Sequence, residues 1–428
     1  MPVLKWLKSL FSCQSGNVMA IAAASMPLLI GAAAIGVDTI QVTLAKRELQ
    51  RAADASALAG AYALVQGKTA ADAVDKDLAL NNRITLSTTR TVQNAPTTGS
   101  YSGNTRAVRV VLTASRSTPF MGFFNRTTQT VSAEATAAWV YNGKFCMIAK
   151  ENGNNTGITF TGSTNVNLGC GVATNSTSAT AVVNSGSASV TASPVAAVGN
   201  VPSSTGYATG TVLLPYSPVQ TDPFASLANP APPTGCNTGT YSVNPNQTAP
   251  TPATTSTNVI CYASYDIKGT VDFGSDKTIY VAGGQLALGS QADVTCVHCT
   301  FVFTGPPGTT ATQATASPIA TLSMHGNAVV NISAANSGIY SKLLMYQDPR
   351  ATAGNSVYIN GNSASTFVGG FYFPSADLTF NGNTGMHTEC IQLVARRLIF
   401  SGNSSVTNVC PADQTAGAID AIFVKLVG

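Results

Sequence analysis

The sequence predicts a mainly β protein that begins with a transmembrane α-helix, continues through a small α+β unit and ends in a parallel β-helix stapled by disulfides. Three observations lead to this fold class. They are an uncharged apolar run near the start, a Gly-Asn motif that recurs about every 20 residues, and nine cysteines that nearly all lie in the later part of the chain. Charged residues form only 9% of the 428 residues, which suits a secreted β-rich protein better than a cytosolic enzyme.

We expect the chain to be divided into four segments. They are a cytoplasmic tail at 1–16, a transmembrane and membrane-proximal helix at 17–64, a small α+β unit at 65–143, and a parallel β-helix at 144–428 with a Pro-rich insertion at about 194–258. Prolines remove backbone donors, so the insertion should leave the regular sheet, either as an extended strap or as a mobile loop.

The first segment boundary is set by the apolar run. Val18–Val37 is uncharged and about as long as a helix that crosses ~30 Å of hydrocarbon. Pro27 lies within it, which a membrane span tolerates better than a soluble helix does. The run continues through Asp38 into the helix-forming residues 43–64, so we favour a retained anchor over a cleaved signal peptide, and either over a buried core helix.

Charges and cysteines predict the orientation of this anchor. Lys5 and Lys8 precede the span, and positively charged residues near a span favour the cytoplasmic side. Lys46, Arg47 and Arg51 argue the other way, but they begin about two helical turns beyond the span. The abundance of cysteines after the span indicates disulfides and an oxidising compartment. We therefore expect a cytoplasmic N-terminus and a periplasmic or extracellular bulk.

The same region carries a family resemblance. Gly16-Asn17, the apolar span with Pro27, Gly36-Val37-Asp38 and the run LQRAADASALAGA at 49–61 together resemble the N-terminus of TadE/TadG-like proteins of the Flp (tight adherence) pilus system. The resemblance implies a bacterial, single-pass, inner-membrane protein with a pilin-like layout. Ile21 stands where type IV prepilins usually carry Glu, so we do not expect prepilin processing.

The residues that follow the span predict a helix on a small sheet. The Ala-rich residues 52–63 suit close approach of another backbone, either in an oligomer or as part of a plain stalk. A further helix is expected at 70–82 and strands at 107–114 and 127–140. This resembles a pilin-like unit, and a membrane-proximal collar is the alternative. Its expected core includes the aromatic residues of the connection between the strands, Phe120, Phe123 and Phe124.

A repeat of about 20 residues dominates the rest of the chain. Gly361, Gly382 and Gly402 follow one another at intervals of 21 and 20 residues, short β-rich pieces precede them, and no helical half is present. A parallel β-helix explains this pattern, with glycine at corners of positive φ and asparagines that bond along the axis. The 35 residues from Gly326 to Gly361 predict an excursion near 346–354. The repeat residues are Gly326, Asn327, Gly361, Asn362, Gly382, Asn383, Gly402 and Asn403.

Cysteine spacing supports the repeat. Cys390 and Cys410 are 20 residues apart, one repeat, and Cys146 and Cys170 are 24 apart. Equivalent positions on adjacent turns lie within disulfide range, while the intervening loop could be closed by Cys236 with Cys261, although the sequence does not fix the pairing. The candidate disulfide cysteines are Cys146, Cys170, Cys236, Cys261, Cys296, Cys299, Cys390 and Cys410.

The later part of the chain extends the resemblance. Cys170-Gly171-Val172, Asp222-Pro223-Phe224 and Gly370-Phe371-Tyr372-Phe373-Pro374, together with the Asn-Gly-Asn repeats, resemble the β-helical ectodomain that often follows a TadE/G-type anchor. This resemblance implies a role in the cell envelope and names no chemistry.

Two clusters could in principle support catalysis. Parallel β-helices also carry polysaccharide-active enzymes, and Arg396 and Arg397 beside Glu389, or Asp348 with Arg350, could supply a base and a charge-stabilising group. Such sites need several acidic residues on one face, and here the acidic residues are few and scattered. We therefore expect no enzyme, with Asp348 and Arg350 as an ion pair at a loop.

Cys296-Val297-His298-Cys299 invites a metal interpretation. Zinc needs four ligands, and the other candidates, His325 and His387, stand alone on separate repeats. We expect oxidised thiols, and no metal or cofactor.

The predicted function is structural. We expect a membrane-anchored component in assembly or anchoring of a Flp-type pilus or a related surface apparatus, with the lipid bilayer at Val18–Val37 and other pilus-assembly or envelope proteins as partners. A carbohydrate-binding surface adhesin that binds glycan is the alternative, and a polysaccharide-active enzyme comes third. No basic stripe interleaved with aromatic residues is present, so no nucleic-acid partner is expected.

Overall fold

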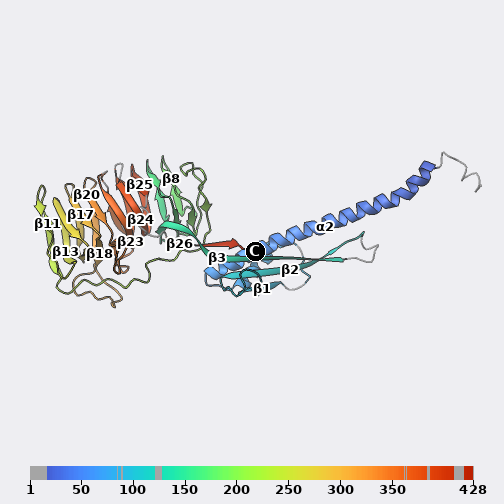
Figure 1. Ribbon diagram of the computed structural model, residues 1–428, viewed down its shortest axis with the longest axis horizontal. Helices are drawn as coiled ribbons and strands as arrows, with labels where there is room; N and C mark the ends of the chain where they lie inside the picture. The colour runs from blue at the N-terminus through green and yellow to red at the C-terminus, as the bar shows by residue number, and fades with distance from the viewer. Residues whose placement is uncertain are drawn as a thin grey trace, which may run out of the picture. The chain divides into compact units, whose positions relative to one another are not determined.

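The computed structural model describes residues 17–83, 85–87, 90–120, 128–360, 362, 364–382, 386–408 and 419–427. The packing of the backbone divides the chain into two compact units. Unit 1 comprises Met1–Val140 and Val424–Gly428, and unit 2 comprises Tyr141–Phe423. The chain is mainly β, with a long apolar helix at its start and disulfides, as the sequence predicts at this level (Figure 1). The finer division into four segments stays a prediction.

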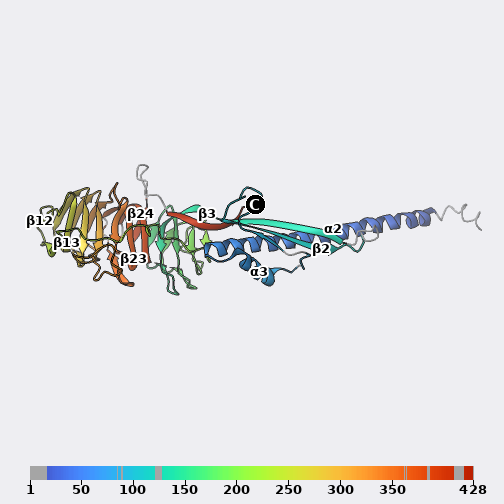
Figure 2. The same cartoon turned by 90° about the horizontal axis from the view of Figure 1, so that it is seen from below.

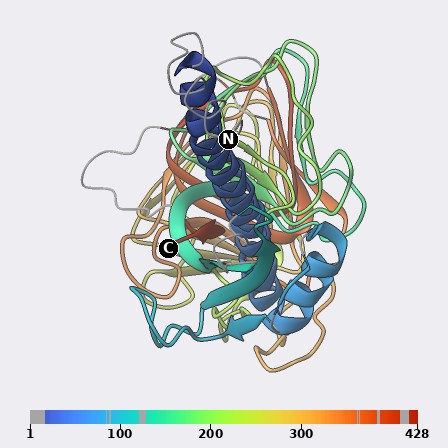
Figure 3. The same ribbon diagram turned by 90° about the vertical axis from the view of Figure 1, so that its right-hand side faces the viewer.

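Unit 1 is built on one helix of 49 residues, α2 (Asn17–Val65). Its second half carries a stripe of small buried residues at i, i+4 spacing, which places them on one face. A second helix, α3 (Ala70–Asn81), packs against α2 (Figures 2 and 3). The stripe contains Ala45, Leu49, Ala53, Ala57 and Ala61.

The stripe of α2 is covered by an antiparallel sheet of the same unit. The sheet consists of β1 (Thr91–Gln93), β2 (Ala107–Ser117) and β3 (Thr128–Ala149). Alternate residues of β2 and β3 are buried, which is the period of a sheet with one face on a core. The buried face is formed by Val108, Val110, Leu112, Ala114, Val131, Ala133, Ala135 and Ala137.

Small side chains let the helix and the sheet approach closely. A Cβ at Gly60 would lie 3.0 Å from Cγ1 of Val108 and 3.2 Å from Cγ2 of Val74. The Gln50 amide of α2 also donates a hydrogen bond of 2.8 Å to the Glu134 carbonyl of β3. The buried stripe of the Ala-rich run is therefore covered by the chain's own sheet.

Of the three aromatic residues expected in a core between β2 and β3, the one that the structure describes is exposed. The Phe120 side chain is 45% exposed, and Phe123 and Phe124 lie outside the described residues. Alanine and valine fill the space under α2 instead, because a helix that approaches this closely leaves no room for phenylalanine rings.

Unit 2 consists of short strands joined in three parallel ladders. The first, ladder A, follows the order β13 (Val259–Ile267), β15 (Thr278–Ala282), β18 (Thr300–Thr304), β21 (Leu343–Gln347), β23 (Thr366–Gly382), β24 (Met386–Gly402), β3, β6 (Gly171–Thr174), β9 (Val195–Ala197) and β10 (Leu213–Leu214).

The other two ladders use the same long strands at different positions. Ladder B follows the order β11 (Asn237–Val243), β13, β16 (Gln285–Leu288), β19 (Thr321–Met324), β22 (Asn355–Ile359), β23, β24, β4 (Ile158–Phe160) and β7 (Val182–Asn184). Ladder C follows the order β12 (Thr248–Ala249), β14 (Thr270–Ser275), β17 (Asp293–Val297), β20 (Val329–Ser333), β23, β24, β25 (Ser405–Asn408), β5 (Asn165–Asn167) and β8 (Ser189–Thr191). A last strand, β26 (Ile419–Leu426), spans the boundary between the units.

The order of strands in the ladders departs from the order of the sequence at one point. Leu393 of β24 pairs with Met147 of β3, and Leu398 pairs with Ile158 of β4. The first strands of unit 2 therefore stack on nearly the last ones. The repeat spacing predicts the sequential pairs, such as Gly382 with Gly402, but not this junction, which joins residues far apart in the sequence.

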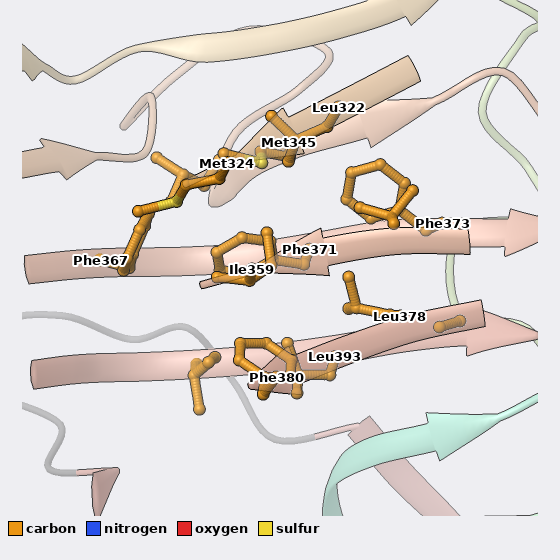
Figure 4. Close-up of a cluster of buried hydrophobic side chains, with 14 of the residues drawn as sticks. Leu322, Met324, Met345, Ile359, Phe367, Phe371, Phe373, Leu378, Phe380 and Leu393 are labelled. Carbon is orange, nitrogen blue, oxygen red and sulfur yellow. The ribbon is translucent and has the colours of Figure 1, made fainter. Parts of the chain in front are cut away.

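Aromatic and aliphatic side chains fill the space between the ladders. The rings of Phe160, Phe400 and Phe380 stack in successive strands with centroids 5.3 and 5.2 Å apart. Phe371 and Phe380 also lie in the close-up of this core, beside Met345 and Leu378 (Figure 4). The stack crosses the junction between β24 and β4, so the core is continuous where the sequence order is broken.

The Pro-rich region has two parts. Strands β9, β10, β11 and β12 within it join the ladders, contrary to the expectation that the whole region leaves the sheet. Residues 215–236, which we call the strap, connect β10 at one end of the ladders to β11 at the other. Ten strand spacings of about 4.8 Å separate β10 from β11, roughly 50 Å in all, and about 20 extended residues can cover this distance.

The glycine corners form a column that the sequence shows only in part. Gly402, Gly162 and Gly186 have φ of 71°, 78° and 71°, and the Ser163 and Ser187 amides bond the carbonyls of Gly402 and Gly162. Gly326 does not adopt a positive φ, so the corner expected there is wrong. Gly361 and Asn383 lie outside the described residues.

The long interval between Gly326 and Gly361 contains a loop before β21 as well as one after it. The excursion expected near 346–354 is misplaced in part, because Tyr346 lies within β21, and residues 334–342 supply further length. The axial role expected of asparagines is found at Asn362, whose amide donates to the Asn327 carbonyl at 3.4 Å. Asn403 is the residue directly after Gly402, with which β24 ends.

Replacing Gly60 with Leu should destabilise unit 1. The new side chain would overlap Val108 and Val74, and overpacking of this kind costs about 1–3 kcal/mol. Denaturant unfolding in detergent measures the change. Gly36→Leu is the matched control, because nothing lies within 4 Å of a Cβ at that position of the same helix. Equal stability of the two variants would contradict the packing described here.

Candidate functional site: the apolar helix and the side chains at its boundary

The apolar side chains of the first half of α2 are exposed, whereas the second half of the helix buries a stripe of its own apolar side chains. From Ile21 onward the helix contains a window with a mean hydropathy of 1.7, of which 6% is buried. Among the described residues this is the one helix long and apolar enough to cross a membrane. Its exposed large side chains include Met19, Ile21, Met26, Leu28, Leu29, Ile30, Ile35 and Val37.

The boundary between the two halves is marked by Asp38. This residue is fully buried, and its Oδ2 accepts a hydrogen bond of 3.0 Å from the backbone N–H of Phe120. Nearby hydroxyls bond to the helix itself, since Thr39 donates to the Ile35 carbonyl and Thr43 to the Thr39 carbonyl, each at 2.8 Å. Polar groups in this part of α2 are thus satisfied within the protein, as an apolar surrounding requires.

The helix with its apolar half, its Asp38 boundary and its small-residue stripe can be compared with known proteins. Residues 16–63 match the family model "Putative Flp pilus-assembly TadE/G-like". This TadE/G-like segment coincides with most of α2, and the resemblance seen in the sequence is confirmed for it. No curated protein and no solved structure matches the chain. The likeness of the later residues to an ectodomain stays a prediction.

The arginines considered for catalysis belong to a four-residue ionic cluster outside the TadE/G-like segment. Arg396 lies 2.9 Å from Glu151 and 2.5 Å from Asp377, and Arg397 lies 3.4 and 3.6 Å from the same two carboxylates. The Glu389 side chain lies outside the described residues. Sequence reasoning missed both carboxylates. The junction of β24 with β3 brings Glu151 to the arginines from a distant position, whereas Asp377 lies one repeat earlier, on β23, where it pairs with Arg397.

The ionic cluster is balanced in charge. Burial raises the pKa of the Asp377 carboxyl although both arginines act in the opposite direction. Two guanidinium groups face two carboxylates, so each charge has a partner and the cluster stabilises the corner between strands.

The second candidate pair holds the strap. Arg350 and Asp348 form a buried ion pair of 2.6 Å at a loop after β21. Arg350 also donates to the carbonyls of Pro230 at 2.9 Å and Thr310 at 2.8 Å. Pro230 belongs to the strap, and its carbonyl accepts a further hydrogen bond of 3.0 Å from the Thr304 hydroxyl.

Aromatic contacts fix the middle of the strap. Asp222 bonds the Lys150 amine at 2.5 Å and accepts a hydrogen bond of 2.9 Å from the Tyr372 hydroxyl. Phe224 packs edge-on against the Tyr372 ring with centroids 5.3 Å apart. Burial raises the pKa of the Tyr346 phenol, whose ring stacks on that of Tyr372. The strap therefore shields this face of ladder A from water.

Six of the candidate cysteines form disulfides. Cys146 bonds Cys170, Cys236 bonds Cys261, and Cys296 bonds Cys299. The second disulfide attaches the end of the strap to β13. Cys410 and the side chain of Cys390 lie outside the described residues.

The Cys-Val-His-Cys run does not act as a zinc ligand set in this arrangement, since both thiols are used in a disulfide. The Nδ1 atom of His298 lies 3.4 Å from an Asp276 carboxylate oxygen, and Nδ1 of His325 accepts a hydrogen bond from the backbone N–H of Asn327. The described residues bring together no group of three or more His, Cys, Asp or Glu able to hold a metal. The His387 side chain lies outside them.

Replacing Arg350 with Lys should loosen the strap. Lysine keeps the charge but cannot reach Asp348 and both carbonyls at once. We expect faster proteolysis within 215–236 and a loss of about 1–3 kcal/mol in unfolding free energy. Arg116→Lys, at an exposed position, is the control. Unchanged proteolysis would show that Arg350 does not hold the strap.

High pH should destabilise unit 2 through its buried phenols. Burial raises the pKa of Tyr207 from 10.0 to about 12, so the unfolded chain loses this proton first as pH rises. The free energy of unfolding therefore falls between these two pH values. Tyr207→Phe should make this fall shallower in denaturant titrations at stepped pH, whereas Tyr216→Phe, with a 68% exposed side chain, should not. Equal slopes for all three proteins would contradict the assignment.

Proposed function

We propose that the protein is a membrane-anchored structural component in assembly or anchoring of a Flp-type pilus or a related surface apparatus. The observation that carries this proposal is the match of residues 16–63 to the TadE/G-like family, on a helix whose described residues from Ile21 to Val37 expose apolar or small side chains. A helical run with the length and composition of Val18–Val37 suits a single span in a bacterial inner membrane.

The orientation follows from chemistry on the two sides of this span. Lys5 and Lys8 favour a cytoplasmic N-terminus by the positive-inside rule. The three disulfides lie beyond the span and need an oxidising compartment. Both arguments support the proposal that unit 2 lies in the periplasm or outside the cell.

Unit 2 is then proposed to be a parallel β-helix that serves as the exported body of the protein. Three parallel ladders with a continuous core support this interpretation. The role is proposed to be non-catalytic, because the described groups considered for catalysis are engaged with carboxylates, with one another or with backbone carbonyls. These groups are Arg396, Arg397, Asp348 and Arg350. The partners are proposed to be the lipid bilayer and other pilus-assembly or envelope proteins.

Membrane fractionation and crosslinking test this function together. The full chain should stay in the membrane pellet after an alkaline wash, and a variant that lacks residues 1–37 should be released into the soluble fraction. A crosslinker added from outside should connect the full chain to components of the pilus apparatus in cells that assemble it.

The controls separate anchoring from the pilus role. A variant in which an unrelated transmembrane helix replaces Val18–Val37 should remain in the pellet. Release of the full chain by the alkaline wash would refute the anchor. Crosslinking to envelope proteins without any pilus component, or binding to a glycan array, would refute the pilus role while leaving the anchor in place.

A further inference from the structure

Apolar exposure on α2 continues beyond the acidic residue that ends the uncharged run. Ile40 and Leu44 are 61% and 53% exposed, whereas Asp38 is fully buried. The end of the β2–β3 hairpin covers this carboxylate, because the Phe120 amide donates to it at 3.0 Å. The hairpin therefore reaches the level of α2 at which the apolar run ends. Figure 2 shows β2 and β3 running alongside α2.

Helix geometry gives the depth of this contact. If Val18–Val37 fills the hydrocarbon, Asp38 lies at its edge, and Leu44 lies about 9 Å farther out at 1.5 Å per residue. The headgroup layer on each side of a bilayer is roughly 5–7 Å thick. Phe120, which bonds Asp38 directly, must then lie in or next to that layer.

The side chains at the hairpin end fit a lipid surface. Phe120 presents a half-exposed aromatic ring next to the span, and Arg116 lies exposed about four residues nearer the water. Aromatic rings at the interface with basic groups behind them are typical of membrane-contacting segments. A lipid surface is favoured over a protein partner here, because the ring lies beside a helix that the bilayer already surrounds.

We propose that the end of the β2–β3 hairpin, Thr118–Phe120, rests in the lipid headgroup region as a second membrane contact of unit 1. The inference depends on the proposed membrane span. It also explains why Asp38 is buried, since an ionisable group at the edge of the hydrocarbon is costly unless the protein covers it. Two contacts, the span and the hairpin, hold unit 1 in a fixed orientation on the bilayer.

Tryptophan quenching in lipid vesicles tests this contact. The full chain with Trp6→Phe is reconstituted in two sets of phosphatidylcholine vesicles, one with acyl chains brominated close to the headgroup, which detects the hairpin end, and one with chains brominated near their ends, which detects the middle of the span. Phe120→Trp reports on the hairpin end, Leu29→Trp on the span, and Tyr101→Trp on the opposite end of the sheet. Trp139, which lies 4.6 Å from the Arg106 guanidinium, supplies a common background. Ser117→Trp, at an exposed position of the same hairpin end, replaces Phe120→Trp if that variant does not fold.

We expect the bromines to quench the fluorescence of the introduced tryptophan in Leu29→Trp and in Phe120→Trp. The fluorescence of the introduced tryptophan in Tyr101→Trp should not change. Quenching of Leu29→Trp alone would overturn the hairpin contact and leave the membrane span standing. Absence of quenching for Leu29→Trp would overturn the span and the contact together. Equal quenching of all three would mean that unit 1 lies flat on the lipid, which also overturns the proposal.

Discussion

The arrangement of unit 2 depends on the parallel pairing of β24 with β3 and β4. This pairing places the strands that begin the unit next to those that nearly end it. Because those first strands are then flanked on both sides, the chain must leave them at one end of the ladders and resume at the other. The strap is the connection that this requires, and Arg350, Asp222 and the disulfide of Cys236 hold it along its course.

The ionic contacts of unit 2 that involve Arg396 and Arg350 also join segments that are far apart in the sequence. The junction brings Glu151 close to Arg396, two residues separated by 245 positions, and the strap brings Pro230 to Arg350 across 120. Charged groups at these places join segments that have no local reason to meet. Removing one partner of such an ion pair would leave a poorly solvated charge without its counter-charge, so these contacts disfavour arrangements in which the segments lie apart.

The sequence alone predicts the features that depend on local patterns. The span is visible in the length of its apolar run, and the register of Gly382 with Gly402 follows from their spacing. The junction at Met147 is invisible because no period connects it to Leu393. Phe120 is misjudged because hydrophobicity predicts burial without saying whether the protein or a lipid surface provides it.

If the chain is exported from its N-terminal end, as proposed above, the junction has a consequence for how unit 2 folds. Segments that emerge from the membrane first include β3, β4 and β5, whose outer edges pair with β24 and β25. Those edges stay open until residues near 408 have been translocated, and open parallel edges are prone to pair with foreign strands. The early strands can pair with one another in sequence order, but the closing step of unit 2, the pairing with β24 and β25, waits for almost the whole chain.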